Sequence, residues 1–455
     1  MKRYRMVHML FSHQMPQMGY LRQLVKRVKE LGANSLLLEY GDKFPSHKHP
    51  EIVSPDAFGF REWREFVIYA ESLGLELIPL VQSLGHVEYV LKHEAYHHLR
   101  ETPDNPWQYC PQKEETFSLL MDFYQEIMEI HPNAPYLHLG CDETWNLCQC
   151  ERCREMSPAR TYSDWVNRLN REVRRRWGKQ TMIWGDMMIP FTCGFRTYPE
   201  IAELLDKNIL ICYWNYWGSR VFPHLKWYRE KGLKVIASSA SCVGEEGQFP
   251  DQNRRIPNVI GFANKSQEYN KVLGDLVTSW IGFNGPPLGS DLFGYGCGLK
   301  AMQSPRMPAE QIEREVAEQI YGTDDSNLLD AIYLLSGNPS WEDAPWRRLA
   351  CQQAKEILSA YDKSDLFIGL LDLNADVYIY KANKVEVLYD VEKGRIEGTD
   401  ARSRIEGVLD ENQAVQQKAE KLLSRLLSPL TVKEMLKEWF GRDRKILVDT
   451  TSTTN

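Results

Sequence analysis

Short apolar runs alternate with amphipathic segments along the first two thirds of the chain. The short runs predict β-strands, and the segments with apolar residues at every third or fourth position predict helices. The predicted strands lie at residues 6–11, 35–40, 76–82, 136–141, 181–186, 209–214, 233–238 and 275–280. Residues 20–32 and 60–74 are the clearest helices, and each ends at a glycine, Gly32 and Gly74, where a left-handed cap is expected.

This succession of strand–helix units predicts a (β/α)8 TIM barrel of the α/β class. A doubly wound sheet is disfavoured, because no glycine-rich phosphate loop follows the first strand. After about residue 305 the pattern contains helical segments alone. We therefore expect a catalytic barrel at residues 1–304, a helical C-terminal module at residues 305–447 and a disordered tail at residues 448–455.

Composition and charge narrow the range of functions. The chain has 455 residues and a net charge of -7, and its basic residues are scattered, which argues against a nucleic-acid partner. No apolar run is long enough for a membrane span. The N-terminal apolar run is interrupted by His8, which predicts a strand rather than a signal peptide. Ten cysteines without regular spacing then favour reduced thiols and a cytoplasmic location.

Polar and aromatic residues gather at the predicted strand ends, where the loops of a TIM barrel form the active site. They are Glu39, His86, Asp142, Glu143, Trp184, Asp186, Tyr213, Trp214, Tyr216 and Trp280. Carboxylates and aromatic rings at one mouth, without a phosphate loop or a dense set of histidines, favour a neutral, polyhydroxylated substrate such as a sugar.

Asp142 and Glu143 are neighbours at the end of the fourth predicted strand. Adjacent side chains in an extended segment point to opposite sides, so the two carboxylates are expected to have different roles unless the chain turns there. Ordinary retaining glycosidases place their two carboxylates on opposite sides of the scissile bond. A neighbouring pair fits a substrate-assisted scheme better, in which one acid protonates the leaving oxygen and the other steadies an attacking group of the substrate.

The segment HLGCDETW, residues 138–145, resembles the His-x-Gly-x-Asp-Glu signature of the family 20 glycoside hydrolases, the β-N-acetylhexosaminidases. The segments LLLEYGDKFP, SLGHVEYVL, WGDMM and YWNYW, at strands two, three, five and six, resemble the hexosaminidase D-like intracellular branch of that family. The resemblance covers roughly residues 5–300. It implies an enzyme that removes terminal β-linked N-acetylglucosamine or N-acetylgalactosamine from glycosides or oligosaccharides.

The resemblance also implies roles for single residues. Glu143 is the implied general acid and base, and Asp142 orients the 2-acetamido group as its carbonyl oxygen closes on the anomeric carbon to form an oxazolinium. Tyr216, or else Tyr213, binds the acetamido group. The other implied substrate contacts are Glu39, His86, Trp184, Asp186, Trp214 and Trp280. No cofactor and no metal are implied.

Three cysteines, Cys148, Cys150 and Cys153, follow the acids. Their C-x-C-x2-C spacing resembles half of a structural zinc site, which Cys110 or Cys141 could complete. Reduced packing thiols and a disulfide or redox role stay open. The competing functions are a sugar-binding barrel without catalysis and a metal-dependent hydrolase. The C-terminal helices could cover the barrel, shape its entrance or pair two subunits in a homodimer.

Overall fold

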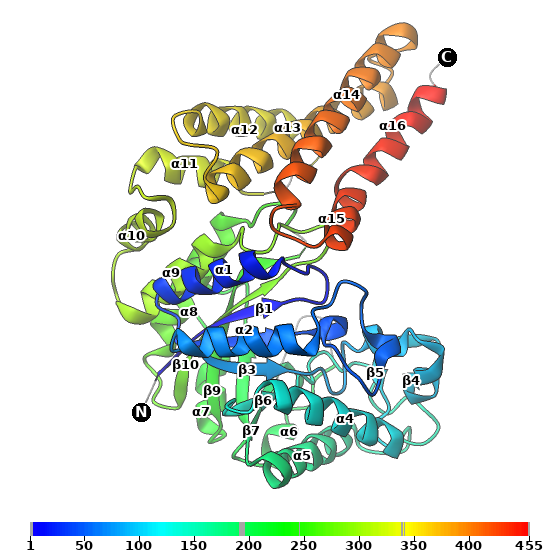
Figure 1. The fold of residues 1–455 in the computed structure, drawn as a ribbon, viewed down its shortest axis with the longest axis vertical. Coiled ribbons are helices and arrows are strands. Elements are labelled where there is room, and N and C mark those ends of the chain that lie inside the picture. Colours follow the sequence, from blue (N-terminus) through cyan, green and yellow to red (C-terminus); the bar gives the residue numbers. More distant parts are fainter. Residues whose placement is uncertain (1–2, 191–195, 245, 338–339, 341, 454–455) are drawn as a thin grey trace.

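The computed structural model describes residues 3–190, 196–244, 246–337, 340 and 342–453. Its centre is a closed barrel of parallel strands in the order β1-β10-β9-β8-β7-β6-β3-β2 (Figure 1). The barrel strands are β1 (Tyr4–Leu10), β2 (Ser35–Glu39), β3 (Glu76–Leu80), β6 (Tyr136–His138), β7 (Gln180–Trp184), β8 (Leu210–Trp214), β9 (Lys234–Val243) and β10 (Val272–Trp280). The predicted TIM barrel is confirmed, with all eight strands at the expected places.

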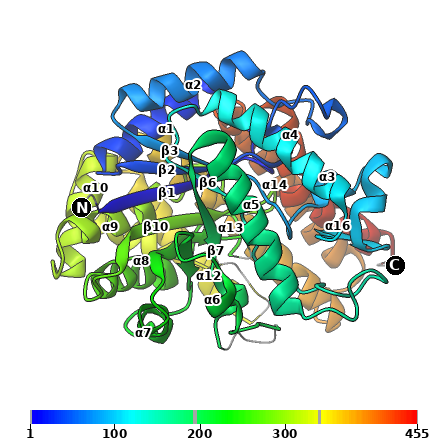
Figure 2. The ribbon, with the colours of Figure 1, turned by 90° about the horizontal axis from the view of Figure 1, so that it is seen from below.

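Helices surround the barrel on its outer side (Figure 2). They are α1 (Met18–Glu30), α2 (Phe60–Ser72), α4 (Glu114–Ile130), α5 (Pro158–Trp177), α6 (Ile201–Leu204), α7 (Pro223–Glu230), α8 (Gln252–Ser266) and α9 (Leu292–Gln303). The two helices predicted most clearly are confirmed with their apolar faces buried. Gly32 and Gly74 follow them with φ of 107° and 75°, the positive values that favour glycine.

The strands divide the core into two parts, because successive side chains of a strand point to opposite faces. One set fills the barrel interior: Met6, Leu37, Ile78, Leu80, Met182, Trp184, Leu210, Cys212, Ile236 and Leu276. The alternate residues, such as Ile211 and Tyr213 of β8, pack between the barrel and the outer helices. This alternation decides which residues at a strand end face the mouth.

A large insertion follows β3 and was not predicted from the sequence. It contains the short helices α3 (Glu88–Leu91) and η3 (Glu94–Leu99) and an antiparallel hairpin of β4 (Arg100–Thr102) and β5 (Asn105–Tyr109). Short helices also follow β2 and β7: η1 (Gly41–Lys43), η2 (Pro50–Ile52) and η4 (Asp186–Met188). These segments all lie on the side of the barrel where the strands end.

The C-terminal region is helical, as predicted. It comprises α10 (Ala309–Tyr321), α11 (Ser326–Leu334), α12 (Ala344–Leu358), α13 (Leu366–Glu392), α14 (Gly398–Leu423), α15 (Pro429–Leu436), the π-helix η5 (Lys437–Gly441) and α16 (Arg442–Thr453). Residues 448–453 are thus helical where the sequence predicted a disordered tail, and residues 454–455 lie outside the described residues. The proposed division at residue 304 falls between α9 and α10 and stays a prediction.

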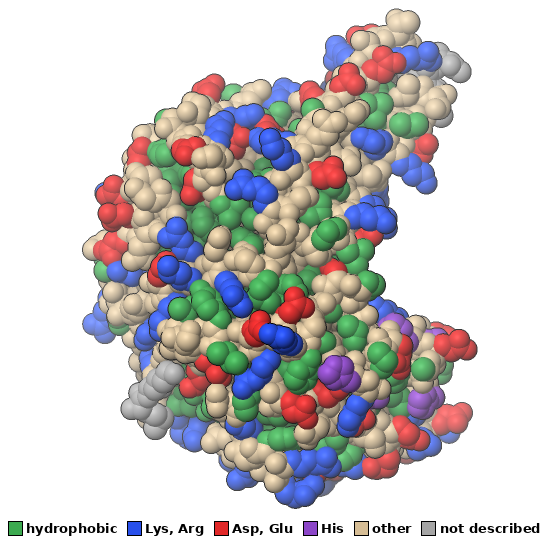
Figure 3. Space-filling model, in the orientation of Figure 1, with side chains coloured by type: hydrophobic (Ala, Val, Ile, Leu, Met, Phe, Trp, Pro, Cys, Tyr) green, Lys and Arg blue, Asp and Glu red, His purple; other side chains and the backbone are tan. Residues whose placement is uncertain are grey.

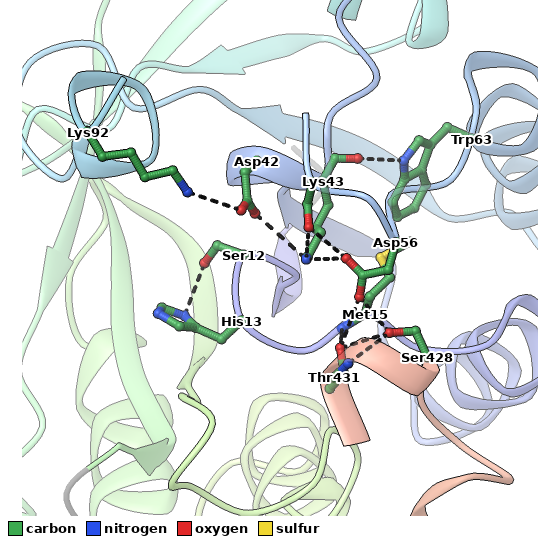
Figure 4. Close-up of polar contacts among 11 residues, drawn as sticks. Ser12, His13, Met15, Asp42, Lys43, Asp56, Trp63, Lys92, Ser428 and Thr431 are labelled. Carbon is green, nitrogen blue, oxygen red and sulfur yellow. Dashed lines mark hydrogen bonds and ion pairs between the residues drawn. The ribbon is translucent and has the colours of Figure 1, made fainter. Parts of the chain in front are cut away.

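The C-terminal helices pack on loops that follow barrel strands. The Ser428 backbone N–H donates to the Met15 carbonyl after β1, and the hydroxyls of Ser428 and Thr431 donate to Asp56 after β2 (Figure 4). The Tyr378 hydroxyl of α13 accepts from the Phe249 N–H after β9. The module therefore borders the mouth of the barrel.

The space-filling view shows the molecule hollowed between the projecting ends of α14 and α16 and the part of the barrel that bears β4 and β5 (Figure 3). Among the described helices, none combines the length and the apolar character needed to cross a bilayer.

Candidate active site

The acids lie in a sharp turn rather than on a strand. β6 ends at His138, three residues earlier than predicted, because Gly140, Cys141 and Glu143 have φ of 65°, 67° and 49°. The Gly140 N–H donates to His138 Nδ1 at 3.0 Å, and a Cβ at Gly140 would meet Gln82 Oε1 at 1.9 Å. Left-handed conformations at two non-glycine residues are costly and concentrate at functional sites.

This turn brings both neighbouring carboxylates to one imidazole. His86 Nε2 lies 3.3 Å from Asp142 Oδ2 and 3.2 Å from Glu143 Oε2. The chain turns at this point, so the extended geometry that would send adjacent acids to opposite sides does not apply. Burial lowers the pKa of His86, but Asp142 and Glu143 outweigh it and hold that pKa well above its ordinary value. The two acids thus favour the protonated form of His86.

Asp186, in η4 at the end of β7, supports the acid turn from a second strand. Its Oδ2 accepts a hydrogen bond of 2.8 Å from the Glu143 backbone N–H, and the residue is only 6% exposed. Burial, followed by the repulsion of the Asp142 carboxylate, raises the pKa of Asp186 to about 8. Burial and this repulsion therefore favour the protonated form of Asp186, and its Oδ2 still accepts from the Glu143 N–H.

A change of Asp186 to Asn is expected to alter the pH dependence of stability. The pKa of Asp186 is raised from 3.8 to about 8 on folding, so its contribution to stability is fully present below about pH 4 and is lost as the pH rises through about 8. Relative to Asp186→Asn, the wild type should therefore lose unfolding free energy across that window, at a slope of up to about 1.4 kcal/mol per pH unit. Urea unfolding at a series of pH values measures the difference, and parallel curves for the two proteins would refute it.

Glu39, at the end of β2, is held from two neighbouring strands. Gln82 Nε2 donates to its Oε1 at 3.0 Å, and His8 Nε2 lies 3.2 Å from its Oε2. Both oxygens of this carboxylate are thus engaged by protein groups. His8 was not predicted as a site residue. The alternation along β1 places its side chain in the barrel interior with Met6, and this could have indicated a contact with Glu39.

Trp214, Trp280 and Tyr216 form an aromatic cluster at the mouth, and Trp184, which is fully buried, packs against Trp280 from the barrel interior. The Trp184 and Trp280 rings are 5.6 Å apart, and Trp214 stacks on Tyr216 with ring centroids 5.1 Å apart and an interplanar angle of 19°. Trp280 Nε1 donates to the Tyr216 hydroxyl at 2.8 Å. Burial raises the pKa of Tyr216 well above its ordinary value, so the hydroxyl keeps its proton and remains a hydrogen-bond donor.

Tyr213 does not lie with this group. It occupies an outward position of β8, is 1% exposed and packs against Tyr228 and Phe262 of the helical layer. Its hydroxyl accepts from Asn215 Nδ2 at 3.2 Å and lies 3.1 Å from His224 Nδ1. The structure therefore separates Tyr213 from the mouth, and Tyr216 is the tyrosine that reaches it.

The insertion after β3 contributes a residue that the sequence did not indicate. Trp107 of β5 donates from Nε1 to the Glu143 carbonyl at 2.9 Å, and its ring centroid lies 4.3 Å from that of His86. Trp145, two residues after Glu143, stacks on Trp107 with centroids 5.5 Å apart. The sequence signal for Trp107 is its place in the long segment between two barrel strands, at the end of the barrel where active sites lie. Strand periodicity does not indicate that its ring reaches the acids.

Metal-binding groups lie elsewhere. Among the described residues, one set of histidine, cysteine and acidic groups is close enough to hold a metal ion: Glu101, Cys110, Cys150 and Cys153. None of the acids at the mouth belongs to it.

A parallel barrel whose mouth combines paired acids, an imidazolium and an aromatic surface has the groups needed to cleave a glycosidic bond by acid catalysis. These features assign the protein to the class of glycoside hydrolases. The model of the catalytic domain of glycosyl hydrolase family 20 matches residues 30–272, and the chain belongs to this family.

Relatives of known name agree with this assignment. Hexosaminidase D of Bos taurus is 35% identical over 256 residues, which cover 53% of this chain and 72% of that protein. Hexosaminidase D of Homo sapiens is 38% identical over 151 residues, which cover 33% of this chain and 31% of that protein. The resemblance inferred from the sequence motifs is confirmed.

Solved structures confirm the fold. The Flavobacterium johnsoniae chitobiase superposes with a TM-score of 0.57 at 14% identity and covers 99% of this chain and 73% of its own. A β-N-acetylhexosaminidase from Bacteroides fragilis gives a TM-score of 0.50 at 18% identity, covering 79% of this chain and 71% of its own. At such identities the likeness is evidence for the TIM barrel alone.

Proposed function

We propose that this chain is an exo-acting β-N-acetylhexosaminidase, which removes terminal β-linked N-acetylglucosamine or N-acetylgalactosamine by a retaining, substrate-assisted mechanism. The single observation that carries the proposal is the convergence of Asp142 and Glu143 on His86 Nε2. One turn thereby presents two acids to the same side of the mouth. The names of the relatives, both hexosaminidases, support the same substrate class.

The surroundings of the other two carboxylates argue against a direct protein nucleophile. Asp186 Oδ2 is engaged by the Glu143 N–H, and burial raises the pKa of this carboxyl, which disfavours the ionised form. Glu39 has both oxygens engaged by Gln82 and His8. A nucleophilic carboxylate must be ionised and free to reach the anomeric carbon. If the substrate's own acetamido group attacks the anomeric carbon, no protein carboxylate has to act as the nucleophile.

In the proposed first step, Glu143 gives its proton to the glycosidic oxygen while the bond from that oxygen to the anomeric carbon breaks. The carbonyl oxygen of the 2-acetamido group forms a new bond to the anomeric carbon, which gives an oxazolinium and releases the alcohol. Asp142 accepts from the acetamido N–H and stabilises its developing positive charge. Glu143, now a carboxylate, then takes a proton from water, whose oxygen opens the oxazolinium ring and regenerates the sugar with retained configuration.

Aromatic residues complete the proposed site. The Tyr216 hydroxyl accepts from Trp280 and retains its own proton to donate to the acetamido oxygen. Trp214 and Trp280 offer apolar faces to the acetyl methyl and the sugar ring, and the buried Trp184 supports Trp280 from below the pocket. His86 holds the two acids in place, and Glu39 remains a proposed partner for sugar hydroxyls. A cytoplasmic location and a homodimer stay predictions.

Hydrolysis of a small panel of 4-nitrophenyl glycosides tests the proposal. The wild type should hydrolyse the N-acetyl-β-glucosaminide or its galactosamine epimer, and the β-glucoside, which lacks the acetamido group, should react at least about a thousandfold more slowly. All three compounds release the same 4-nitrophenolate, so the comparison isolates the acetamido group. Turnover of none of them would favour a sugar-binding barrel without catalysis, and equal turnover of all three would exclude substrate assistance.

A further inference from the structure

Four potential metal ligands converge beside the acid turn, from segments far apart in the sequence. Cys150 Sγ lies 3.0 Å from Cys153 Sγ and 3.5 Å from Cys110 Sγ, and Cys153 Sγ lies 3.0 Å from Glu101 Oε1. All four ligand atoms lie within 4.8 Å of one another. Glu101 belongs to β4, Cys110 follows β5, and the other two cysteines lie in the loop after Glu143.

We propose that Glu101, Cys110, Cys150 and Cys153 form a closed structural Zn²⁺ site. Zinc in structural sites is tetrahedral, with Zn–S bonds of about 2.3 Å, so bound sulfurs are separated by roughly 3.8 Å. The observed sulfur separations require only a small expansion to reach this geometry. Cys110, Cys150 and Cys153 are all free thiols, and 3.0 Å between Cys150 and Cys153 is well beyond a disulfide bond of about 2.05 Å.

The carboxylate of Glu101 supplies a second, independent observation. Glu101 is 1% exposed, and its Oε1 accepts from the backbone N–H groups of Gln149 and Cys150. Its Oε2 is buried and has no hydrogen-bond partner among the described residues. Among the residues that the structure describes, no Lys, Arg or His forms an ion pair with Glu101. A buried carboxylate beside three thiols requires a compensating positive charge, which a divalent cation provides.

The structure selects a different set of ligands from the one that the sequence motif suggested. Cys148 Sγ donates to Thr161 Oγ1 at 3.4 Å and is not a member of the convergent group. The C-x2-C half of the motif is retained, Cys110 is the third thiol, and Glu101 supplies the fourth ligand. No sequence spacing indicates Glu101, because the hairpin of β4 and β5 brings it to the loop.

The proposed zinc joins the hairpin to the loop that follows the acids. Trp107, in the same hairpin, donates to the Glu143 carbonyl and packs on the His86 ring. Gln108 Oε1 accepts from the Asn146 N–H at 3.1 Å. Zinc would thus hold the hairpin against the turn that presents the acids, without taking part in the reaction.

Metal content of the purified full-length protein tests the site. Inductively coupled plasma mass spectrometry should find about one zinc per chain in the wild type, and less than about a tenth of that in Cys150→Ser and Cys153→Ser. Cys148→Ser, the same change in the same loop, is the matched control and should retain the zinc. Retention of full zinc in both ligand variants would overturn the assignment.

Cobalt gives a second readout that does not depend on how the variants fold. Wild-type protein stripped of metal and titrated with Co²⁺ should develop the visible and near-ultraviolet absorption of tetrahedral cobalt bound by thiolates, saturating at one equivalent. Wild-type protein that is isolated without zinc and binds neither Co²⁺ nor Zn²⁺ would overturn the proposal. An intact mass that reveals a Cys150–Cys153 disulfide in protein purified under reducing conditions would do the same.

Discussion

Replacement of Asp142 by Asn is expected to lower kcat/KM for 4-nitrophenyl N-acetyl-β-glucosaminide by about a thousandfold. Asn preserves the size of the side chain but removes the negative charge that faces the acetamido nitrogen as it becomes positive. An amide can also orient the acetamido group wrongly, by presenting NH2 where an acceptor is needed. Steady-state kinetics of the wild type and the variant measure the loss, which should fall mainly on kcat because the charge develops in the transition state.

Asp164→Asn is the matched control for this change, since the Asp164 side chain is exposed on α5. It should leave both kinetic constants within about twofold of the wild type. Asp142→Asn should also remain folded by circular dichroism. Activity within about tenfold of the wild type in a folded Asp142→Asn protein would contradict the role assigned to Asp142.

Replacement of Glu143 by Gln is expected to have an effect that depends on the leaving group. Alkyl glycosides or chitobiose need protonation of the leaving oxygen, and the variant should lose about 10³- to 10⁴-fold in kcat/KM on them. A 4-nitrophenolate leaves without a proton, so the same variant should lose far less on the aryl glycoside. Kinetics on both substrates give the ratio, which does not depend on the fraction of active enzyme.

Glu151→Gln offers a control in the same loop, because Glu151 is exposed after the acid turn. It should not change the ratio of the two activities. Equal losses on activated and unactivated substrates in Glu143→Gln would show that Glu143 does not act as the acid. They would point instead to a general disturbance of the turn or of the contact with His86.

The barrel could be predicted from the sequence because its strands and helices differ in hydrophobic period. Each barrel strand has a short apolar run, and α1 and α2 present apolar stripes that end at Gly32 and Gly74. The family motif located the acids for the same local reason, since Asp142 and Glu143 are adjacent in the chain. The alternation of side chains along a strand also decides whether a strand-end residue faces the barrel interior or the outer helices. This alternation places Tyr213 on the helix side, away from the mouth where the sequence analysis expected it.

What the sequence could not provide depends on contacts between distant segments. The turn at residues 140–143 replaces the extended geometry that strand periodicity implies. It depends on the close packing of Gly140 against Gln82, which cannot be inferred from the sequence. Trp107 and Glu101 reach the acid loop through a hairpin whose short strands have no distinct apolar pattern. The raised pKa of Asp186 arises from burial and from Asp142, which lies on another strand end.

The C-terminal helices also acquire a place that no pattern in the sequence indicated. Ser428 and Thr431 at the start of α15 bind Asp56, which in turn accepts from the buried Lys43 near the end of β2 (Figure 4). The module is thus fixed to loops at the mouth, and the hollow in Figure 3 lies beside it. This placement is compatible with an entrance that admits the end of a glycan chain.

Attack of the substrate's acetamido group on the anomeric carbon is tested most directly by fluorination of that group. Fluorine withdraws electrons and weakens the carbonyl oxygen as a nucleophile while changing its size little. Wild-type kcat/KM should fall progressively from the acetyl to the mono-, di- and trifluoroacetyl 4-nitrophenyl glycosides, by about a hundredfold or more over the series. Rates that are independent of fluorination, with the acetyl compound still hydrolysed, would show that a protein group or water attacks instead.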